Sequence, residues 1–527
     1  MEFSKPAIEY AELWPLLLVF GLGCIGVLIE AFLPRGSRHH VQLGVALVGT
    51  VAAFVGVVLI GTGLEDHGEA SGSIVAEGAF AVDGPTVFIW GLLLLIAAAG
   101  LLLFAERKLE GGLSAFAGQA AALPGTEAER EASTRGLDHT EVFPLMMFAV
   151  SGMMIFAAAN DLLTLFVGLE VLSLPLYLLS GLARRRRLLS QEAALKYFLL
   201  GAFSSGFVIY GIALVYGYAG TMGYAGIYEA IANTTGNRAM LLIGLGLISV
   251  GLLFKVGAVP FQAWTPDVYQ GAPTQVTAFM AAATKVAAFA AMMRLFYVAF
   301  GSERWSWEPM LWLIAILSMV VGAILAVAQS DIKRMLAYSS ITHTGFLITG
   351  LIGIKAVGEA GDGQITATQS VLFYLVTYAF MTLGAFAIVS LVRDSGGEAT
   401  HLSRWAGLGK ESPLVAAAFS LFLLGFAGIP LTAGFSGKWA VFASAMSGGA
   451  WPVVVVAVLT SALAAFFYIR VIVLMYFAEP QGPGPSVTLP SLLTSTTIGV
   501  AVLATIVLGV MPGPVLDLAA HAGEFIR

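Results

Sequence analysis

The sequence predicts an all-α polytopic membrane protein with about fourteen transmembrane helices, because its composition suits lipid and its apolar runs are long. Of the 527 residues, 58% are hydrophobic and only 11% are charged, against roughly 25% charged residues in a typical soluble domain. The mean hydropathy is +0.89. A soluble chain of this length needs a polar surface that such a composition cannot supply, which excludes an ordinary soluble enzyme.

The individual spans follow from apolar runs that end at charged or Pro/Gly-rich stretches. Because the hydrocarbon offers no water to backbone groups, long continuous runs are expected to be helices and not barrel strands. The runs cover residues 13–33, 41–62, 86–105, 142–159, 161–182, 193–216, 240–259, 274–298, 308–328, 335–355, 369–393, 414–447, 451–478 and 491–512.

These spans group into four segments along the chain. Residues 1–141 are expected to hold three spans and a long polar loop, and residues 142–300 the next five spans. Residues 301–480 are expected to hold a second set of five spans, and residues 481–527 the last one.

Two stretches outside the spans have their own patterns. Residues 106–141 mix both signs of charge with Gly, Ala and Ser, which predicts a flexible loop without chemistry of its own. Ser73 to Asp83 alternates weakly between polar and apolar residues, which predicts a small hairpin.

The distribution of Lys and Arg sets the expected orientation. Loops after odd-numbered spans contain fifteen of these residues and loops after even-numbered spans contain three. Since Lys- and Arg-rich loops stay in the cytoplasm, both termini are expected on the outer side. The fifteen include the run Arg184 to Arg187, which we interpret as a topology anchor, and the three are Arg238, Arg304 and Lys355.

Several functions are excluded by what the chain lacks. The single cysteine, Cys24, cannot form an intramolecular disulfide or supply an iron–sulfur or zinc site. The formal charge of −6 gives no support to nucleic-acid binding. No Gly-rich phosphate loop follows a strand pattern. We therefore expect no redox cofactor, metal or nucleotide in this chain.

Few ionisable residues lie well inside the apolar runs, and these are the candidate functional residues. They are Glu170, Lys255, Lys285 and Lys438. A lysine at mid-bilayer costs about 2.5–3.5 kcal/mol, and such residues mark ion or proton paths. Three further cations lie nearer the span ends and are expected to extend their charges to the interface: Lys196, Arg294 and Arg470.

Proline and glycine interrupt two of the spans beside these lysines. Lys255 is followed by Val-Gly-Ala-Val-Pro260, and Lys438 is preceded by Gly428-Ile-Pro-Leu-Thr-Ala-Gly-Phe-Ser-Gly437. Helix breaks free carbonyls and half-helix ends that can stabilise ions. The two interrupted spans, the seventh and twelfth, are five apart, which predicts two inverted five-helix repeats formed by spans 4–8 and 9–13.

Several motifs resemble one family of membrane proteins. They are Phe254-Lys-Val-Gly-Ala-Val-Pro-Phe-Gln-Ala-Trp-Thr-Pro-Asp-Val-Tyr-Gln-Gly-Ala-Pro273, Asn160-Asp-Leu-Leu, Asp331-Ile-Lys-Arg-Met-Leu-Ala-Tyr-Ser-Ser-Ile-Thr-His343 and Gly428-Ile-Pro-Leu-Thr-Ala-Gly-Phe. The stretch from about 142 to 478 resembles the subunit N family of proton-pumping NADH-quinone oxidoreductase, respiratory complex I. The resemblance is closer to subunit N than to the two larger antiporter-like subunits.

This resemblance implies a role for each candidate residue. It implies that Glu170 pairs with Lys255, that Lys285 is the central relay, and that His343 connects it to Lys438, the outer proton-transfer residue. It also implies that NADH, FMN, iron–sulfur clusters and quinone bind in partner subunits. The expected partners are an adjacent antiporter-like subunit and small membrane-arm subunits, in a bacterial cell membrane and as part of a translocase.

The sequence departs from the family pattern at two positions, and two other classes of function are considered. Gln262 stands where the family usually has a histidine and cannot titrate near neutrality, and Gln275 stands where proline is usual. A cation/proton antiporter of the Mrp type or a membrane-bound hydrogenase arm shares the Glu, Lys and broken-helix pattern. The lysine at 438 and the stretch Val268 to Pro273 favour subunit N. A purely structural membrane subunit is the third class.

Overall fold

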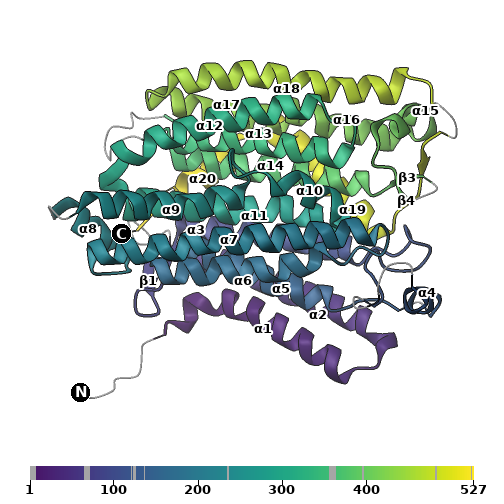
Figure 1. Cartoon of the computed structure of the whole chain (residues 1–527), viewed down its shortest axis with the longest axis horizontal. Coiled ribbons are helices and arrows are strands. Elements are labelled where there is room, and N and C mark those ends of the chain that lie inside the picture. Colours follow the sequence, from purple (N-terminus) through teal and green to yellow (C-terminus); the bar gives the residue numbers. More distant parts are fainter. Residues whose placement is uncertain are drawn as a thin grey trace.

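The structure is a computed structural model of the whole chain, and helices make up most of it. It describes residues 8–64, 72–119, 122, 126–135, 137–233, 237–354, 364–394, 397–480, 484–523 and 525–526. The helices run side by side along the long axis of the view in Figure 1, and the start of α1 and the C-terminus lie at the same end of the bundle. Lys355, which counted toward the expected orientation, lies outside the described residues.

The first segment contains three long helices and a hairpin. They are α1 (Tyr10–Phe32), α2 (Arg35–Leu64), β1 (Gly72–Val75), β2 (Phe80–Asp83) and α3 (Gly84–Phe104). The two strands pair antiparallel, which confirms the predicted hairpin. Asp83 then caps α3 by accepting a hydrogen bond from the Thr86 N–H at 3.1 Å.

The second segment contains the first interrupted span. Its helices are α5 (Val142–Ala158), α6 (Leu162–Ser180), α7 (Arg187–Ala219), α8 (Tyr224–Asn233), α9 (Arg238–Val256), α10 (Trp264–Gly271) and α11 (Thr274–Arg294), which continues as one π-helical turn, Leu295–Ala299. Between α9 and α10 the backbone leaves the helix at Gly257, whose φ of +71° suits glycine. The seventh expected span is therefore discontinuous.

The remaining segments contain the second interrupted span and the C-terminal helices. The long elements are α12 (Arg304–Val327), α13 (Ile332–Leu351), α14 (Ala367–Val389), α16 (Pro413–Ala427), α17 (Ala433–Ser447), α18 (Trp451–Phe477), α19 (Leu492–Val510) and α20 (Gly513–His521). The short ones are η3 (Gly301–Glu303), β3 (Val392–Asp394), β4 (Gly397–Glu398), η4 (Leu402–Trp405), α15 (Leu408–Glu411) and β5 (Ser486–Val487). The twelfth expected span is split into α16 and α17.

Eleven helices in the described part of the chain are long and apolar enough to cross a membrane, and α5 and α16 are shorter apolar helices. This agrees with the all-α membrane fold that the composition predicts. The total of about fourteen spans, the segment boundaries and the inverted relation of the two five-helix repeats stay predictions.

Burial increases from the rim of the bundle to two central helices. The apolar window is wholly buried in the helix formed by α11 and its π turn, and 94% buried in α14, but only 33% buried in α2 and 28% buried in α19. Figure 1 places α11 and α14 between α18 on one side and α1 on the other. α11 is rich in alanine, and small residues let neighbouring helices pack closely in lipid.

The described part of the long polar loop contacts the arginine run. The run Arg184 to Arg187 faces its carboxylates: Arg184 bonds Asp138 at 3.0 Å and Arg185 bonds Glu110 at 2.7 Å. The loop also contains a short helix, α4 (Glu127–Thr134). Carboxylates of the loop thus pair with Arg184 and Arg185, whereas Arg186 and Arg187 donate to the Glu398 and Ala122 carbonyls. The flexibility of the loop stays a prediction.

Arg294 does not extend to the membrane interface, so that prediction is wrong. Its side chain is 1% exposed, and it donates to Asp83 and to the Thr86 hydroxyl at 2.6 Å each. A buried carboxylate removes the need for the guanidinium to reach water. Lys196 is partly exposed and pairs with Asp267 at 2.8 Å, whereas Arg470 is exposed and donates to backbone carbonyls at the end of α12.

Candidate functional site

The five residues singled out from the sequence come from five different helices: Glu170 from α6, Lys255 from α9, Lys285 from α11, His343 from α13 and Lys438 from α17. The last four are buried, with 3%, 2%, 1% and 4% of each residue exposed. Glu170 is partly exposed. Buried polar groups require hydrogen-bond partners in an apolar interior, so the partners of these side chains define the site.

Lys255 lies in the last turn of α9, where the helix is interrupted. Its Nζ donates to Ser173 Oγ at 2.8 Å and to Tyr197 Oη at 3.2 Å. The Tyr177 and Tyr197 rings lie 5.9 and 5.3 Å from the ammonium, where their faces attract a cation. Hydroxyls and rings therefore surround this lysine.

The family resemblance implies a pair of Glu170 with Lys255. Among the described contacts these two side chains make no hydrogen bond with each other, although the carboxylate is near enough to interact electrostatically with the ammonium. The Ser205 hydroxyl donates to Glu170 instead. Ser173, three residues after Glu170 on the same face of α6, holds the ammonium. Lys255 is therefore bonded to α6 one turn away from the Glu170 carboxylate.

The carbonyls freed at the first helix break have partners from other parts of the fold. The indole N–H of Trp264 donates to the Phe254 carbonyl at 2.9 Å. The Thr344 hydroxyl donates to the Val256 carbonyl, also at 2.9 Å. Because these acceptors are occupied, Lys255 bonds to side chains and not to the end of its own helix.

Lys285 lies on the wholly buried helix α11 and is held by one turn of α13. Its Nζ donates to the Ser340 carbonyl at 2.5 Å and to the Thr344 hydroxyl. The Tyr378 ring lies 5.4 Å from the ammonium, and its hydroxyl donates to Ser340 Oγ at 2.8 Å. Thr344 thus contacts both this lysine and the carbonyl of Val256, the residue after Lys255.

His343 lies beside Thr344 on α13 and contacts two buried tyrosines. Its Nδ1 is 2.6 Å from Tyr374 Oη and its Nε2 is 3.3 Å from Tyr468 Oη. Tyr468 also bonds Ser339 on α13. Since each imidazole nitrogen and each phenol can donate or accept, the direction of these bonds can reverse.

Lys438 lies on α17 and reaches back to the end of α16. Its Nζ donates to the carbonyls of Phe426 and Ala427 at 2.9 and 3.0 Å and to Ser461 Oγ at 2.8 Å. α16 ends at Ala427 and is capped by Gly428, whose φ is +83°. A cation at a helix C-terminus is favoured by the dipole and satisfies free carbonyls.

Two phenylalanine rings lie between the surroundings of His343 and those of Lys438. The His343 ring lies 5.4 Å from the Phe426 ring, and the Lys438 ammonium lies 4.9 Å from the Phe346 ring on α13. No hydrogen bond joins His343 directly to Lys438 among the described contacts. α13 therefore contacts Lys285, the tyrosines and the surroundings of Lys438.

The sequence analysis did not single out the hydroxyls that complete this site. Tyr374 and Tyr378 are four residues apart inside an apolar run, so they share a helix face. Ten of the 15 tyrosines lie in the expected spans, so tyrosine is a weaker signal there than lysine, and only the spacing of this pair marks it. No such signal marks the other missed residues, because serine and threonine are common in membrane helices: Ser173, Tyr197, Ser340, Thr344, Ser461 and Tyr468.

The two glutamines that depart from the family pattern differ in position. Gln262 lies in the break between α9 and α10, and Gln275 lies in the first turn of α11. The side-chain oxygen of each is buried without a hydrogen-bond partner among the described residues. Gln275 is the second residue of α11, which begins at Thr274 after Pro273. The start of this helix is therefore regular although position 275 is not a proline.

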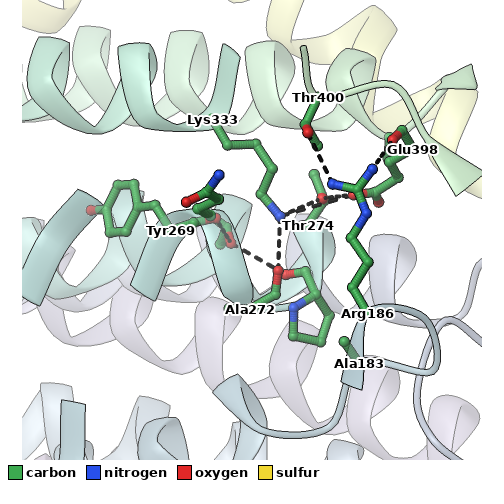
Figure 2. A network of polar contacts seen from close by, with 12 residues as sticks. Ala183, Arg186, Tyr269, Ala272, Thr274, Lys333, Glu398 and Thr400 are labelled. Atoms are coloured by element: carbon green, nitrogen blue, oxygen red, sulfur yellow. Dashed lines mark hydrogen bonds and ion pairs between the residues drawn. The ribbon is translucent and has the colours of Figure 1, made fainter. Parts of the chain in front are cut away.

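A second polar cluster joins the start of α13 to the end of α10. Lys333 on α13 donates to the Ala272 carbonyl at 2.8 Å and to Thr274 Oγ1 at 3.0 Å. Glu398 lies 3.9 Å away, and Arg186 donates to its backbone carbonyl at 3.0 Å. Figure 2 shows Lys333 and Arg186 converging on this junction from opposite sides. The start of α13 therefore fixes the second half of the interrupted span.

No group of three or more His, Cys, Asp or Glu side chains in the described part of the chain could hold a metal ion. The absence of a cofactor from this chain stays a prediction. The site as built contains amines, hydroxyls, one imidazole and one carboxyl, all of which can donate or accept protons.

The fold and the site define the class of protein. Residues 159–464, more than half of the chain, match the family described as NADH:quinone oxidoreductase/Mrp antiporter, transmembrane. The bundle with two interrupted helices that carry buried lysines is thus the fold of an antiporter-like membrane subunit.

Curated relatives narrow this class. NADH-quinone oxidoreductase subunit N of Nocardioides sp. (strain ATCC BAA-499 / JS614) is 67% identical over 533 residues, covering all of both chains. The subunit N of Mycobacterium tuberculosis (strain ATCC 25618 / H37Rv) is 52% identical over 545 residues, again covering all of both. The chain belongs to the subunit N family of NADH-quinone oxidoreductase, which confirms the family indicated by its motifs.

Solved structures agree with this assignment. A chain of respiratory complex I from Thermus thermophilus superposes with a TM-score of 0.74 at 32% identity, covering 97% of this chain and 100% of the other. A chain of the Mrp complex from Dietzia sp. DQ12-45-1b has a TM-score of 0.80 at 19% identity, covering 98% and 97%. At that identity the second likeness shows a common fold.

Proposed function

We propose that this chain moves protons across a bacterial cell membrane as a membrane-arm subunit of NADH-quinone oxidoreductase, and that its relay consists of Glu170, Lys255, Lys285, His343 and Lys438. The observation that carries the proposal is α13, one helix that carries His343, holds Lys285, and contacts Lys438 and the residue after Lys255. A buried lysine surrounded by hydroxyls can exchange a proton without leaving an unsatisfied donor.

The energy for this transfer has to come from outside the chain. Moving one charge through 100 mV costs about 2.3 kcal/mol. We infer that NADH, FMN, iron–sulfur clusters and quinone are bound in partner subunits and that no redox step occurs here. An adjacent antiporter-like subunit and small membrane subunits are the proposed partners, and the whole assembly is the translocase.

The arrangement of charges supports an orientation with both termini outside. The start of α1 and the C-terminus lie at one end of the bundle, and α4 and β4 lie at the other (Figure 1). The run Arg184 to Arg187 contacts the loop that holds α4 and the strand β4. Lys- and Arg-rich segments stay in the cytoplasm, so we place that end inside.

The alternative is a cation/proton antiporter of the Mrp type, which the shared fold keeps open. Lys438 argues against this alternative, because its ammonium already occupies two backbone carbonyls at the second helix break. A transported cation would need such oxygen ligands to be free. Stimulation of transport by sodium in reconstituted vesicles would favour the alternative, whereas sodium-independent proton uptake supports the proposal.

The test is the variant Lys255→Ala in the assembled enzyme, with proton uptake measured alongside quinone reductase activity. We expect proton uptake per NADH to fall, because the amine at the first helix break is lost. Lys410→Ala is the matched control, since Lys410 is an exposed lysine outside the long helices. Unchanged uptake in a fully assembled Lys255→Ala enzyme would contradict the relay and favour a purely structural subunit.

A further inference from the structure

A large apolar groove lies between α2 and α19, away from the buried lysines. Its volume is about 1480 Å³. The walls come from α2 and α19, the floor from α3 and α14, and the end from α20 and the residues after it. Its outer edges include Val58, Leu503 and Val507, which are exposed. The groove is therefore continuous with the membrane-facing sides of two spans.

The groove reaches about halfway across the membrane. On α2 its lining runs from Phe54 to Leu64, and on α3 from Gly84 to Leu95. At 1.5 Å per residue these stretches are about 15–17 Å long. The hydrocarbon core is about 30 Å thick. The lining thus extends from the end of the bundle that holds the termini to the middle of the bilayer.

We propose that this groove binds the acyl chains of one membrane phospholipid from the leaflet on the side of the termini. Its depth fits the chains of one leaflet, whereas a transmembrane helix from a partner would need about 20 residues and the full thickness. Polar groups occur only near its end, where Thr62 and His521 lie. An amphiphile with its headgroup at that end and its chains along the wall satisfies both the apolar and the polar part of the lining.

The bound chains would contact the helix that carries two tyrosines next to the relay. Val376 and Phe380 of α14 form part of the floor. Tyr374 and Tyr378 lie on the same helix and contact His343 and Ser340 on its other side. A lipid in the groove therefore packs against the back of α14, where water or an empty space would leave its apolar side chains without contacts.

The test uses the assembled complex in proteoliposomes that contain phospholipids with a photoreactive group at a defined carbon of one acyl chain. We expect groups near the headgroup to label the peptide around Thr62 and groups near the chain end to label the peptide around Leu95. Labelling that does not follow depth would overturn the proposal. Absence of labelling, because a partner subunit covers the groove, would overturn it as well.

Two glycine variants give the matched comparison. A Cβ at Gly91 would meet only Phe54 and Val57 atoms, at 3.8 and 3.9 Å, so Gly91→Phe places its ring in the groove. Gly499 on α19 has nothing within 4 Å and does not line the groove. We expect loss of the depth-ordered labelling in Gly91→Phe and its retention in Gly499→Phe. Depth-ordered labelling that persists in both variants would contradict the assignment. Labelling of the same peptides by a quinone with a photoreactive tail, at the expense of labelling by the phospholipid, would contradict it as well.

Discussion

The two helix breaks differ in which groups bond to the backbone carbonyls that each break frees. At the first, Trp264 and Thr344 occupy the free carbonyls, and Lys255 bonds to the hydroxyls of Ser173 and Tyr197. At the second, Lys438 itself occupies the carbonyls of Phe426 and Ala427. The first lysine is therefore dispensable for the backbone around it, whereas the second is part of the structure of its break.

This difference separates structural from functional consequences of removing each lysine. Hydroxyls left by Lys255 can bond to other groups, because each is both donor and acceptor. Carbonyls left by Lys438 can only accept. Variants at the two positions should thus lose proton transfer alike but differ in stability.

The largest expected effect is that of Lys438→Met. The Phe426 carbonyl loses its lysine donor, at a cost of about 1–3 kcal/mol, whereas the Ala427 carbonyl keeps a hydrogen bond from the Ser461 hydroxyl at 3.4 Å. We therefore expect a lower midpoint temperature of thermal disassembly and a loss of proton translocation. Lys255→Met should lose translocation with a much smaller change in that midpoint. Differential scanning fluorimetry of the two purified complexes measures the gap. Equal midpoints would remove the structural distinction between the breaks.

A smaller effect is expected from Gly428→Ala. Its φ of +83° disfavours any side chain, and a Cβ would lie 3.0 Å from Lys438 Cδ. Gly449→Ala is the matched control, with a φ of +88° and nothing within 4 Å. Both should lose about 1 kcal/mol through the backbone. Only Gly428→Ala should also slow proton uptake, and equal uptake in both variants would show that the position of Lys438 does not matter.

At the first break, Ser173→Ala removes one acceptor of the Lys255 ammonium. Within the described part of the chain, protonated Lys255 then keeps only the Tyr197 hydroxyl as acceptor, so we expect slower proton translocation, by a smaller factor than in the lysine variants. Ser249→Ala is the control, since Ser249 on α9 is buried and bonds only the Leu245 carbonyl among the described contacts. Stopped-flow measurements with a pH dye compare them. A similar loss in both would indicate a packing effect.

The smallest effect concerns a contact outside the spans and provides a reference for pH experiments. Burial raises the pKa of Glu106, but hydrogen bonds from Ser491, Thr494 and two backbone N–H groups outweigh it, so the pKa lies below the ordinary 4.5. A carboxyl with a lowered pKa stabilises the fold above its ordinary pKa and loses this contribution as pH falls through the lowered value. Glu106→Gln should therefore reduce the thermal midpoint at pH 7, and the gap from the unsubstituted enzyme should close below pH 4.5. A constant gap across this range would exclude the carboxylate as its cause.

The sequence contains enough to predict the membrane fold and the charged part of the site. Charges are so rare in the apolar runs that Lys255, Lys285 and Lys438 stand out, and the adjacent glycines and prolines indicate the breaks. The structure buries all three lysines and interrupts both helices.

What could not be predicted is which groups meet. The sequence does not show that Ser173, and not Glu170, holds Lys255, because both lie on one face of α6 and their distances depend on packing. Nor does it show that Arg294 finds Asp83, more than 200 residues away. Pairing between residues so far apart depends on the tertiary arrangement, which the local sequence pattern does not determine.

The central claim is that protons cross through the buried amines and hydroxyls around α13. Its most direct test is the number of protons translocated per NADH oxidised in inverted membrane vesicles with the variant Lys285→Met, measured next to the unsubstituted enzyme. The account predicts a lower ratio while quinone reduction continues in the presence of an uncoupler. An unchanged ratio in a fully assembled Lys285→Met complex would contradict it.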